Sequence, residues 1–544
     1  MKYITALAFA LLYGQFCKAQ NTIGLLEYVE GNAEGYVLFS PMSDSTTYLI
    51  DKCGEKVHEW STHYRPGLGA QLGEDGFLYR SCNIGNNIFQ RGGRSGRIEK
   101  FDWESNLVWS YDILDTMQCS HHDFHIMPNG NILLIVWDRI LKTEAAALGK
   151  DAESMGTNDL WGERIIEIQP VGLNQANIIW EWSVWDHLIQ DFDATKPNYG
   201  TVSSNPHRVN INYFPGGNLS ADWLHFNSVT YNEELNQVMV SVHTLNELWI
   251  IDHSTTTAEA ATSVGGASGR GGDLLYRWGS PAAYGLGTAN NQTLYAQHHA
   301  TWIPVGMPYE NQIIVFNNGM NSPQGNFSSV VIIEPPLNGH IYDLTPGETY
   351  APLDPVWTYS PDTTLFYAGN LSGVFPLANG NYLATIGPSS NFFEITSTGD
   401  VVWRYKSPIA GNGVLSQGSN MITAPVFRAE FIPVNYAGIA GQNLQAYGEI
   451  ELNAQSPSIC EELGIGISET TRLFSLELFP NPAHEYIEIR CENGGERLEV
   501  SNVIGERVLS LPMNATSLRI DISHFMPGMY FVSLGGKSKS FIKE

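Results

Sequence analysis

A short aromatic phrase occurs six times along the chain and decides the fold: VHEW (57–60), LVWSY (107–111), IIWEW (178–182), LLYRW (274–278), PVWTY (355–359) and VVWRY (401–405). Two further short runs precede each copy, as GYVLFS (35–40) and TTYLID (46–51) precede the first. These runs alternate or are rich in β-branched residues, and turn residues separate them, which is the pattern of antiparallel strands. One repeat therefore holds at least three strands.

The six repeats predict an all-β chain built around a six-bladed β-propeller. In such a ring, flat aromatic side chains at a fixed place in each repeat fill the space between neighbouring blades. Insertions such as 137–160 and 183–222 are expected to project from one end of the ring. A pair of β-sandwiches is the alternative all-β arrangement. The reference aromatic residues are Trp60, Trp109, Trp182, Trp278, Tyr359 and Tyr405.

Composition limits the classes of function. The chain has 544 residues, of which 43% are hydrophobic, so it can bury a large core. Its 29 Lys and Arg against 56 Asp and Glu give a net charge of -27, which argues against nucleic acid as a partner. Beyond the N-terminus no run approaches the roughly 18 apolar residues of a membrane span.

The two ends of the chain carry other signals. Residues 1–19 combine Lys2, an apolar run and a small residue at Ala19, the order of a secretory signal peptide. The propeller is expected over 20–452, followed by a polar linker at 453–471. Residues 472–544 alternate as strands and predict a small C-terminal β-sandwich. After cleavage an exported protein can form one or two disulfides, whose pairing the spacing leaves open, among Cys53, Cys82, Cys119, Cys460 and Cys491.

A column of histidines runs through the repeats. When four repeats are aligned on the turn that opens the first strand, one column lies six residues before that turn. Residues just before the innermost strand of each blade converge on the central channel of a propeller. We therefore expect the column to form one polar funnel, and it contains His122, His225, His298 and Asn370.

Three converging imidazoles suit two kinds of chemistry. They can ligate a metal such as Zn²⁺ or Fe²⁺, or they can handle an anion and its proton. The polar neighbours Asn227, Ser228 and His243 offer hydrogen-bonding groups, which favours the second interpretation. That interpretation requires neither a cofactor nor a metal.

Four phrases, taken together, resemble the bacterial arylsulfate sulfotransferase family. The resemblance covers roughly residues 22–450 and includes the three histidine-bearing segments in order. It implies a six-bladed propeller that moves a sulfuryl group from an aryl sulfate ester to a phenolic acceptor without a nucleotide sulfate donor. The phrases are HHDFHIMPNGNIL (121–133), DWLHFNSVTYNEELNQVMVSVHTLNELWIIDH (222–253), YAQHHATWIPVG (295–306) and VFRAEFIPVNY (426–436).

The resemblance also implies roles for single residues. His298 matches the family's nucleophile, which becomes transiently sulfated, and His122 and His225 match its companion histidines. Asn227 matches a polar residue of the H-x-N-S phrase. The family's Arg position falls on His243, which predicts a more acidic pH optimum or weaker sulfotransfer, because imidazole must be protonated to match a guanidinium. Arg428 can substitute for that Arg if the closing blade brings it to the channel.

The C-terminal segment resembles the sorting domain that the type IX secretion machinery reads. The similarity lies in the turn at 480–482, the N-x-x-G turn at 502–505 and the phrase PGMYFV (527–532) before a basic tail. It implies secretion or display on the cell surface by way of the periplasm, with that machinery as a partner. Two other functions stay open for the propeller: a metal-dependent hydrolase or lyase that uses the three histidines, and a non-catalytic binding or adhesion propeller.

Overall fold

The computed structural model describes residues 21–215, 220–454, 460, 477–490, 496–502, 507–513, 515–534 and 537–544. They fall into two compact units, within Met1–Ile459 and Cys460–Glu544. The signal peptide expected at 1–19 and most of the linker expected at 453–471 lie outside the described residues. Among these residues no helix is long and apolar enough to cross a membrane.

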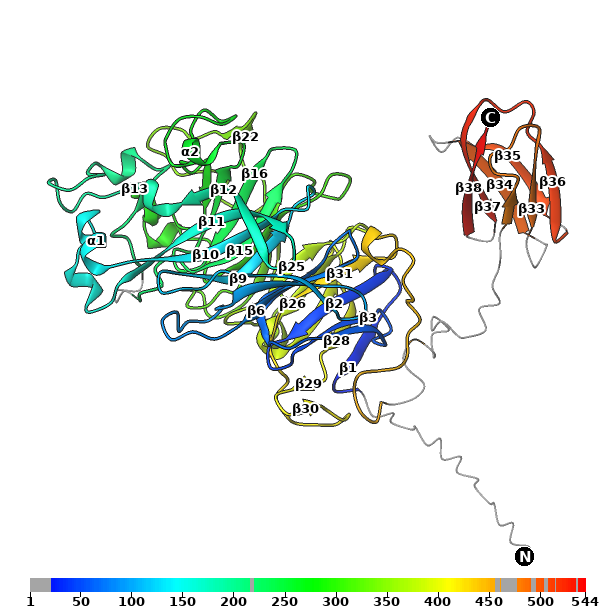
Figure 1. The fold of residues 1–544 in the computed structure, drawn as a ribbon, viewed down its shortest axis with the longest axis horizontal. Coiled ribbons are helices and arrows are strands. Elements are labelled where there is room, and N and C mark those ends of the chain that lie inside the picture. The colour runs from blue at the N-terminus through cyan, green and yellow to red at the C-terminus, as the bar shows by residue number, and fades with distance from the viewer. Residues whose placement is uncertain are drawn as a thin grey trace, which may run out of the picture. The chain divides into compact units, whose positions relative to one another are not determined.

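The first unit is a six-bladed propeller of antiparallel sheets (Figure 1). Five blades have four strands and the last has five, whereas the sequence predicts a minimum of three. The innermost strands are β5 (Pro66–Leu72), β9 (Gln118–Ile126), β15 (Phe226–Asn232), β19 (His298–Trp302), β25 (Gly373–Pro376) and β31 (Val426–Pro433). They contact one another in a closed circle, so they line the central channel.

The remaining strands of each blade follow outward from the channel. The second strands are β6 (Leu78–Asn83), β10 (Ile132–Ile140), β16 (Gln237–Val242), β20 (Ile313–Asn317), β26 (Tyr382–Ile386) and β2 (Gly35–Pro41). The third are β7 (Gly96–Phe101), β11 (Leu160–Val171), β17 (Glu247–Asp252), β21 (Ser329–Ile333), β27 (Asn391–Ile395) and β3 (Thr46–Asp51). The aromatic phrases form the outer strands β8 (Leu107–Asp112), β12 (Gln175–Ser183), β18 (Tyr276–Trp278), β24 (Trp357–Tyr359), β28 (Val401–Lys406) and β4 (Lys56–Ser61).

Both ends of the repeat region help to close the ring. β31 comes from the far end of the unit and pairs with β2, so that Gly35 lies opposite Pro433. β1 (Gly24–Tyr28) pairs with β28 and becomes the fifth strand of the last blade. The first and last blades are therefore built from segments about 370 to 400 residues apart, as the pairing registers give.

The repeated tryptophan explains the repeated phrase. In every blade an outer-strand indole N–H donates to a backbone carbonyl of the next blade along the chain, and the last returns to the first. The pairs are Trp60 with Asp102, Trp109 with Gln175, Trp182 with Gly272, Trp278 with Pro352, Trp357 with Ser397 and Trp403 with Lys52. The equivalent residues of the last two repeats are thus Trp357 and Trp403. The sequence-based choice of Tyr359 and Tyr405 was wrong, because only indole carries this N–H donor.

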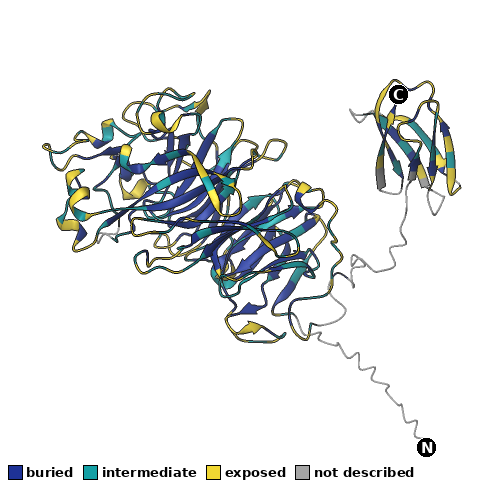
Figure 2. Cartoon of the chain, viewed as in Figure 1, coloured by how far each residue is buried: buried dark blue, intermediate teal, exposed yellow. Residues whose placement is uncertain are grey.

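Buried residues fill the sheets, whereas the connecting segments are largely exposed (Figure 2). The connection between β10 and β11 contains α1 (Lys142–Ala147), and that between β12 and β15 contains β13 (Leu188–Ile189) and β14 (Val209–Asn210). Strand alternation puts both connections at the end where the inner strands begin. The expected insertion at 137–160 is shorter than predicted, because β10 continues to Ile140. The other short elements are α2 (Thr257–Ala260), β22 (Leu337–Asn338), β23 (Ile341–Tyr342), β29 (Ile409–Ala410) and β30 (Gly413–Val414).

The second unit is a β-sandwich with its own hydrophobic core. One sheet contains β32 (Glu477–Phe479), β33 (Tyr486–Arg490) and β36 (Ser517–Asp521). The other contains β34 (Glu496–Asn502), β35 (Arg507–Met513), β37 (Gly528–Leu534) and β38 (Lys537–Lys543).

Two classes of cysteine are present among the described residues. Cys53 and Cys460 each take part in a disulfide bond. Cys82 and Cys119 are buried free thiols. Cys491 lies outside the described residues.

Candidate active site

The inner strands are irregular where they carry histidine. The pairing registers of β9, β15 and β19 with their neighbours each shift near the start of the strand. His122 has φ 50° and His225 has φ 55°, a left-handed backbone that is uncommon outside glycine. Bulges of this kind redirect side chains and are common beside active sites. His225 directly precedes β15, as the sequence indicates, whereas His122 lies within β9 and His298 is the first residue of β19.

Four imidazole rings form a continuous cluster at this end of the channel. The His122 and His225 ring centroids are 4.4 Å apart in an edge-on arrangement. His243, at the end of β16, lies 5.2 Å from His225 on one side and 5.2 Å from His298 on the other. The fold therefore brings together the three histidines of the predicted column, and it adds His243 between two of them.

The hydrogen bonds of His298 define its protonation. Its Nδ1 lies 2.9 Å from the Asn318 side-chain oxygen and 3.1 Å from the Ala296 carbonyl, so both neighbours are acceptors. The Asn318 orientation is fixed because its Nδ2 donates to the carbonyls of Ala368 and Leu371. Nδ1 therefore carries the proton and Nε2 keeps a lone pair. The Leu371 backbone N–H donates to that Nε2 at 3.2 Å.

His225 has a different partner. Its Nδ1 lies 2.5 Å from one carboxylate oxygen of Asp222, and the other oxygen accepts the Trp137 indole N–H at 3.0 Å. Asp222 is buried, whereas the His225 side chain is 21% exposed. Among the four rings of the cluster, His225 is the one with a carboxylate directly on a ring nitrogen. That carboxylate can stabilise a positive charge on it.

His121 joins the cluster from behind, although the sequence assigns it no role. Its Nδ1 lies 2.8 Å from Nδ1 of His122, and its Nε2 lies 2.8 Å from Oε2 of Glu163 on β11. The ring stacks on Trp137 with the centroids 4.1 Å apart. His121, Glu163, Asp222 and Asn318 are partners that the sequence analysis missed. Only the doublet of His121 and His122 gave any signal.

Burial lowers the basicity of most of the cluster. It lowers the pKa of His298 to about 4, although the hydrogen bond to Asn318 acts in the opposite direction. Burial also holds the pKa of His122 well below its usual value, and the charge of His225 adds to this. The same two causes hold the pKa of His243 well below 6.5. His298 is therefore neutral at neutral pH, with Nε2 able to act as a nucleophile.

Glycine is required beside His122. Gly93 has φ +81°, and a Cβ there would come within 2.0 Å of Cε1 of the His122 ring. The Gly93 carbonyl also accepts the His122 backbone N–H at 2.7 Å. This glycine lets the chain pass directly over the imidazole and hold it in place.

The other predicted site residues lie in different settings. Asn227 is fully buried and donates to the Gln297 carbonyl at 2.8 Å, so it contacts the residue before His298. Asn370 is exposed and precedes Leu371. Arg428 does reach the channel. Its Nη2 donates to Asp123 on β9, and its Nη1 has no hydrogen-bond partner among the described residues. It lowers the pKa of His298, so it lies within electrostatic reach of that ring.

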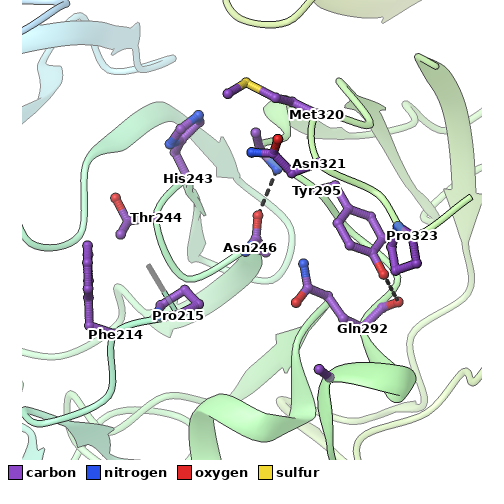
Figure 3. Close-up of a pocket in the computed structure, with 12 residues that line it drawn as sticks. Phe214, Pro215, His243, Thr244, Asn246, Gln292, Tyr295, Met320, Asn321 and Pro323 are labelled. Atoms are coloured by element: carbon purple, nitrogen blue, oxygen red, sulfur yellow. Dashed lines mark hydrogen bonds between the residues drawn. The ribbon is translucent and has the colours of Figure 1, made fainter. Parts of the chain in front are cut away.

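A cavity of about 440 Å³ opens beside the cluster, and His243 forms part of its wall (Figure 3). Figure 3 shows Phe214 and Pro215 at the lower left, Met320 and Asn321 at the top, and Tyr295 with Gln292 on the right. Tyr295 donates to the Gln292 carbonyl at 3.1 Å, which fixes its ring. None of the residues that line this cavity is Lys or Arg.

The described residues contain no group of three or more His, Cys, Asp or Glu with a geometry that can hold a metal ion. The interactions of the imidazoles are edge-on ring contacts and hydrogen bonds to Asn318, Asp222 and His121. This arrangement does not favour the metal-dependent alternative.

No curated protein matches the chain. Among solved structures, a protein of unknown function from Bacteroides caccae is 11% identical, with a TM-score of 0.40 and coverage of 74% of this chain and 99% of that one. The periplasmic gluconolactonase PpgL of Pseudomonas aeruginosa is 9% identical, with a TM-score of 0.36 and coverage of 74% and 100%. Likenesses at this level carry no information about activity.

Two family models match the sequence itself. Residues 477–544 match the secretion system C-terminal sorting domain, as predicted, so the protein is exported and is either secreted or displayed on the cell surface. Residues 47–407 match the arylsulfotransferase model. That match includes every residue of the imidazole cluster and spans more than half of the chain, and so the chain belongs to the arylsulfotransferase family.

Proposed function

We propose that the protein transfers a sulfuryl group from an aryl sulfate ester to a phenolic acceptor through a sulfohistidine at His298, without a nucleotide donor. In the first step Nε2 attacks sulfur, an N–S bond forms, and the ester S–O bond breaks to release the donor phenolate, which takes a proton from an acid in the site or from water. In the second step the acceptor phenol gives its proton to a base in the site or to water, its oxygen attacks the same sulfur, and the N–S bond breaks. The observation that carries this proposal is the tautomer of His298, which has its proton on Nδ1 and a lone pair on Nε2, where the Leu371 N–H donates.

The surrounding charges suit the transition state. Sulfuryl transfer, like phosphoryl transfer, is loose, so catalysis depends on positioning and on charge near the equatorial oxygens. The Asp222 carboxylate on Nδ1 of His225 can stabilise a positive charge on that ring, whereas burial holds the pKa of His243 well below 6.5. The Leu371 N–H loses its acceptor when Nε2 becomes sulfated, and it can then donate to a sulfuryl oxygen.

The cavity favours an aryl donor over a nucleotide donor. Phe214, Tyr295 and Met320 give it apolar walls that suit a phenyl ring. A nucleotide sulfate donor carries several phosphate charges, and proteins bind such groups with Arg or Lys. The lining residues include neither.

The test is an assay with a chromogenic aryl sulfate, with and without a phenol and with and without a chelator. We expect turnover that phenol stimulates and chelator does not change. Mass spectrometry of protein quenched with donor alone should find one sulfuryl group on His298. His298→Ala should remove both the turnover and the modified peptide, while thermal unfolding stays close to that of the wild type.

Other outcomes point to other functions. Turnover that the chelator abolishes indicates the metal-dependent hydrolase or lyase. No turnover at any pH with any aryl sulfate indicates a binding or adhesion propeller. A sulfuryl group on a different residue removes the role assigned to His298.

A further inference from the structure

Behind the imidazole cluster lies a buried chain of three ionisable groups that the transfer reaction described above does not use. It runs from His122 through His121 to Glu163, with 2.8 Å between the two Nδ1 atoms and 2.8 Å between Nε2 of His121 and Oε2 of Glu163. The side chains of His121 and Glu163 are fully buried. The His122 ring contacts His225 in the cluster, and its Nδ1 contacts His121, so the chain has one end in the imidazole cluster and one end in the core.

These contacts permit two proton arrangements that differ by one proton and one unit of charge, and both imidazoles are neutral in each of them. If Glu163 is a carboxylate, it accepts Nε2–H of His121, whose Nδ1 accepts Nδ1–H of His122, and Nε2 of His122 is left as a base. If Glu163 is protonated, it donates to Nε2 of His121, Nδ1–H of His121 donates to His122, and Nε2–H of His122 is left as an acid. The two states differ by one proton that enters or leaves at Nε2 of His122.

We propose that Glu163 and His121 form a proton relay that lets His122 act as acid in the first half-reaction and as base in the second. This inference rests on the proposed function. When the donor ester breaks, the leaving phenolate takes the proton from Nε2 of His122. One proton then moves from His121 to His122 and one from Glu163 to His121, so Glu163 becomes a carboxylate. The acceptor phenol reverses these transfers as its oxygen attacks sulfur.

The relay accounts for the negative charge that the donor leaves in the site. When His298 takes the sulfuryl group and the neutral phenol departs, the negative charge of the donor remains in the protein. The relay moves that charge to Glu163, away from the sulfuryl oxygens, and no second imidazolium is needed in the buried cluster. His225 can keep its own proton throughout, because Asp222 holds it.

The surroundings of Glu163 contain groups that favour each of its two protonation states. Burial and the nearby carboxylates of Asp222 and Asp138 raise its pKa well above the usual value, whereas the backbone N–H groups of Phe226 and His225 favour the carboxylate. The Phe226 N–H lies 3.0 Å from Oε1. Burial also holds the pKa of His121 well below its usual range, which disfavours a charged intermediate on the ring. Two carboxylates in one site thus have separate tasks, Asp222 with a fixed charge and Glu163 with an exchangeable proton.

The test is the dependence of the rate on the leaving group, measured with a series of substituted phenyl sulfates. Glu163→Gln retains an acceptor for the Phe226 N–H but cannot exchange a proton. We expect the rate for a donor whose phenol has a pKa of about 10 to fall by about 10²-fold or more, because that phenolate needs protonation. A nitrophenyl donor, whose phenolate leaves without a proton, should lose only a few-fold. The plot of rate against leaving-group pKa should therefore become steeper.

Glu167→Gln is the matched control. Glu167 lies on the same strand, is 3% exposed, and holds His253 at 2.9 Å in a similar buried pair outside the cluster. It should keep the wild-type slope. A merely structural role of Glu163 predicts a uniform loss with all donors and an unchanged slope, and that result overturns the relay.

His121→Phe provides a second variant if Glu163→Gln does not fold. Phenylalanine can keep the stack on Trp137 but breaks the relay, so the slope should steepen in the same way. A wild-type slope in this variant also overturns the relay. The two proposals fail differently: a wild-type protein without transfer, or with sulfation elsewhere, refutes the proposed function, whereas transfer through His298 with unchanged slopes refutes the relay alone.

Discussion

At the scale of single residues, four imidazoles of one cluster differ because their second ring nitrogens face different partners. An amide and a carbonyl oxygen fix the proton of His298 on Nδ1, and a carboxylate holds that of His225. The side chain of His243 contacts two rings and the cavity and has a strongly lowered pKa. Chemically identical side chains therefore differ in their surroundings: His298 has a lone pair on Nε2, His225 is paired with a carboxylate, and His243 forms part of the cavity wall.

The acid limb of the pH profile should report His298. Its pKa is lowered from 6.5 to about 4, so Nε2 keeps its lone pair until the pH falls to that range. We expect kcat/KM for a nitrophenyl sulfate to fall below about pH 4 and to be flat across pH 6.5. The measurement is a rate profile with recovery of activity after return to pH 7. A limb centred near 6.5 contradicts the assigned tautomer and burial.

His243→Arg tests the departure from the family pattern. The side chain borders a cavity of about 440 Å³, so there is room for a guanidinium. A permanent charge between His225 and His298 should stabilise the sulfuryl oxygens, and we expect kcat at pH 7 to 8 to rise about tenfold or more. His243→Gln, which is uncharged, is the control and should bring no gain. A decrease with Arg indicates that neutral His243 has a role of its own.

At the scale of secondary structure elements, the outer strands join blade to blade through the indole N–H. Six such bonds follow the ring, and the bond from Trp403 to Lys52 crosses the seam where the chain closes. Lys52 also lies over the Trp403 ring at 3.8 Å and pairs with Glu394 at 2.6 Å. The closing seam therefore depends on a cation–π contact and a buried ion pair in addition to strand pairing.

Trp403→Phe should weaken this seam. Trp403 is fully buried, so the change leaves the Lys52 carbonyl without a partner and opens a small cavity. We expect the free energy of unfolding to fall by about 1–3 kcal/mol, measured by urea denaturation. Trp357→Phe removes the equivalent bond at a partly exposed position, where water can replace it, and should cost less. Equal losses in both variants contradict the role given to burial.

At the scale of the whole molecule, the transferase unit and the sorting domain have separate cores. The imidazole cluster and its cavity use residues of the first unit alone. The second unit matches a sorting domain, whose task is export. Activity and destination are therefore encoded in different parts of the chain.

A variant that ends at residue 471 tests this division and keeps Cys460. In a host with the type IX secretion machinery, we expect it to stay inside the cell envelope, whereas full-length His298→Ala should reach the surface or the medium. Purified truncated protein should keep the full-length kcat/KM within about twofold. Normal export of the truncated protein, or loss of its activity, contradicts the division.

The local sequence pattern was sufficient to predict much of the fold. The period of the aromatic phrase predicted six blades, because a propeller repeats one unit that must fill the same gap each time. The alternation after residue 472 predicted the sandwich. The column with His122, His225 and His298 predicted a convergent site, because equivalent positions of successive blades approach one axis. The sequence did not show that Trp357 and Trp403, rather than Tyr359 and Tyr405, are the equivalent aromatic residues of the last two repeats. Either residue fits the aromatic pattern, and only the indole hydrogen bond distinguishes them.

The sequence by itself thus determined the propeller, the division into two units and the convergence of His122, His225 and His298, because these follow from repeated and alternating patterns. Only the tertiary structure decided what each histidine can do. The partners that set protonation, Asp222, Glu163 and Asn318, come from segments with no shared period. Their effect depends on atoms 2.5 to 2.9 Å apart inside a site where burial lowers the pKa of His122, His243 and His298. A hydrogen bond and its desolvation are properties of positions in space, and no spacing along the chain encodes them.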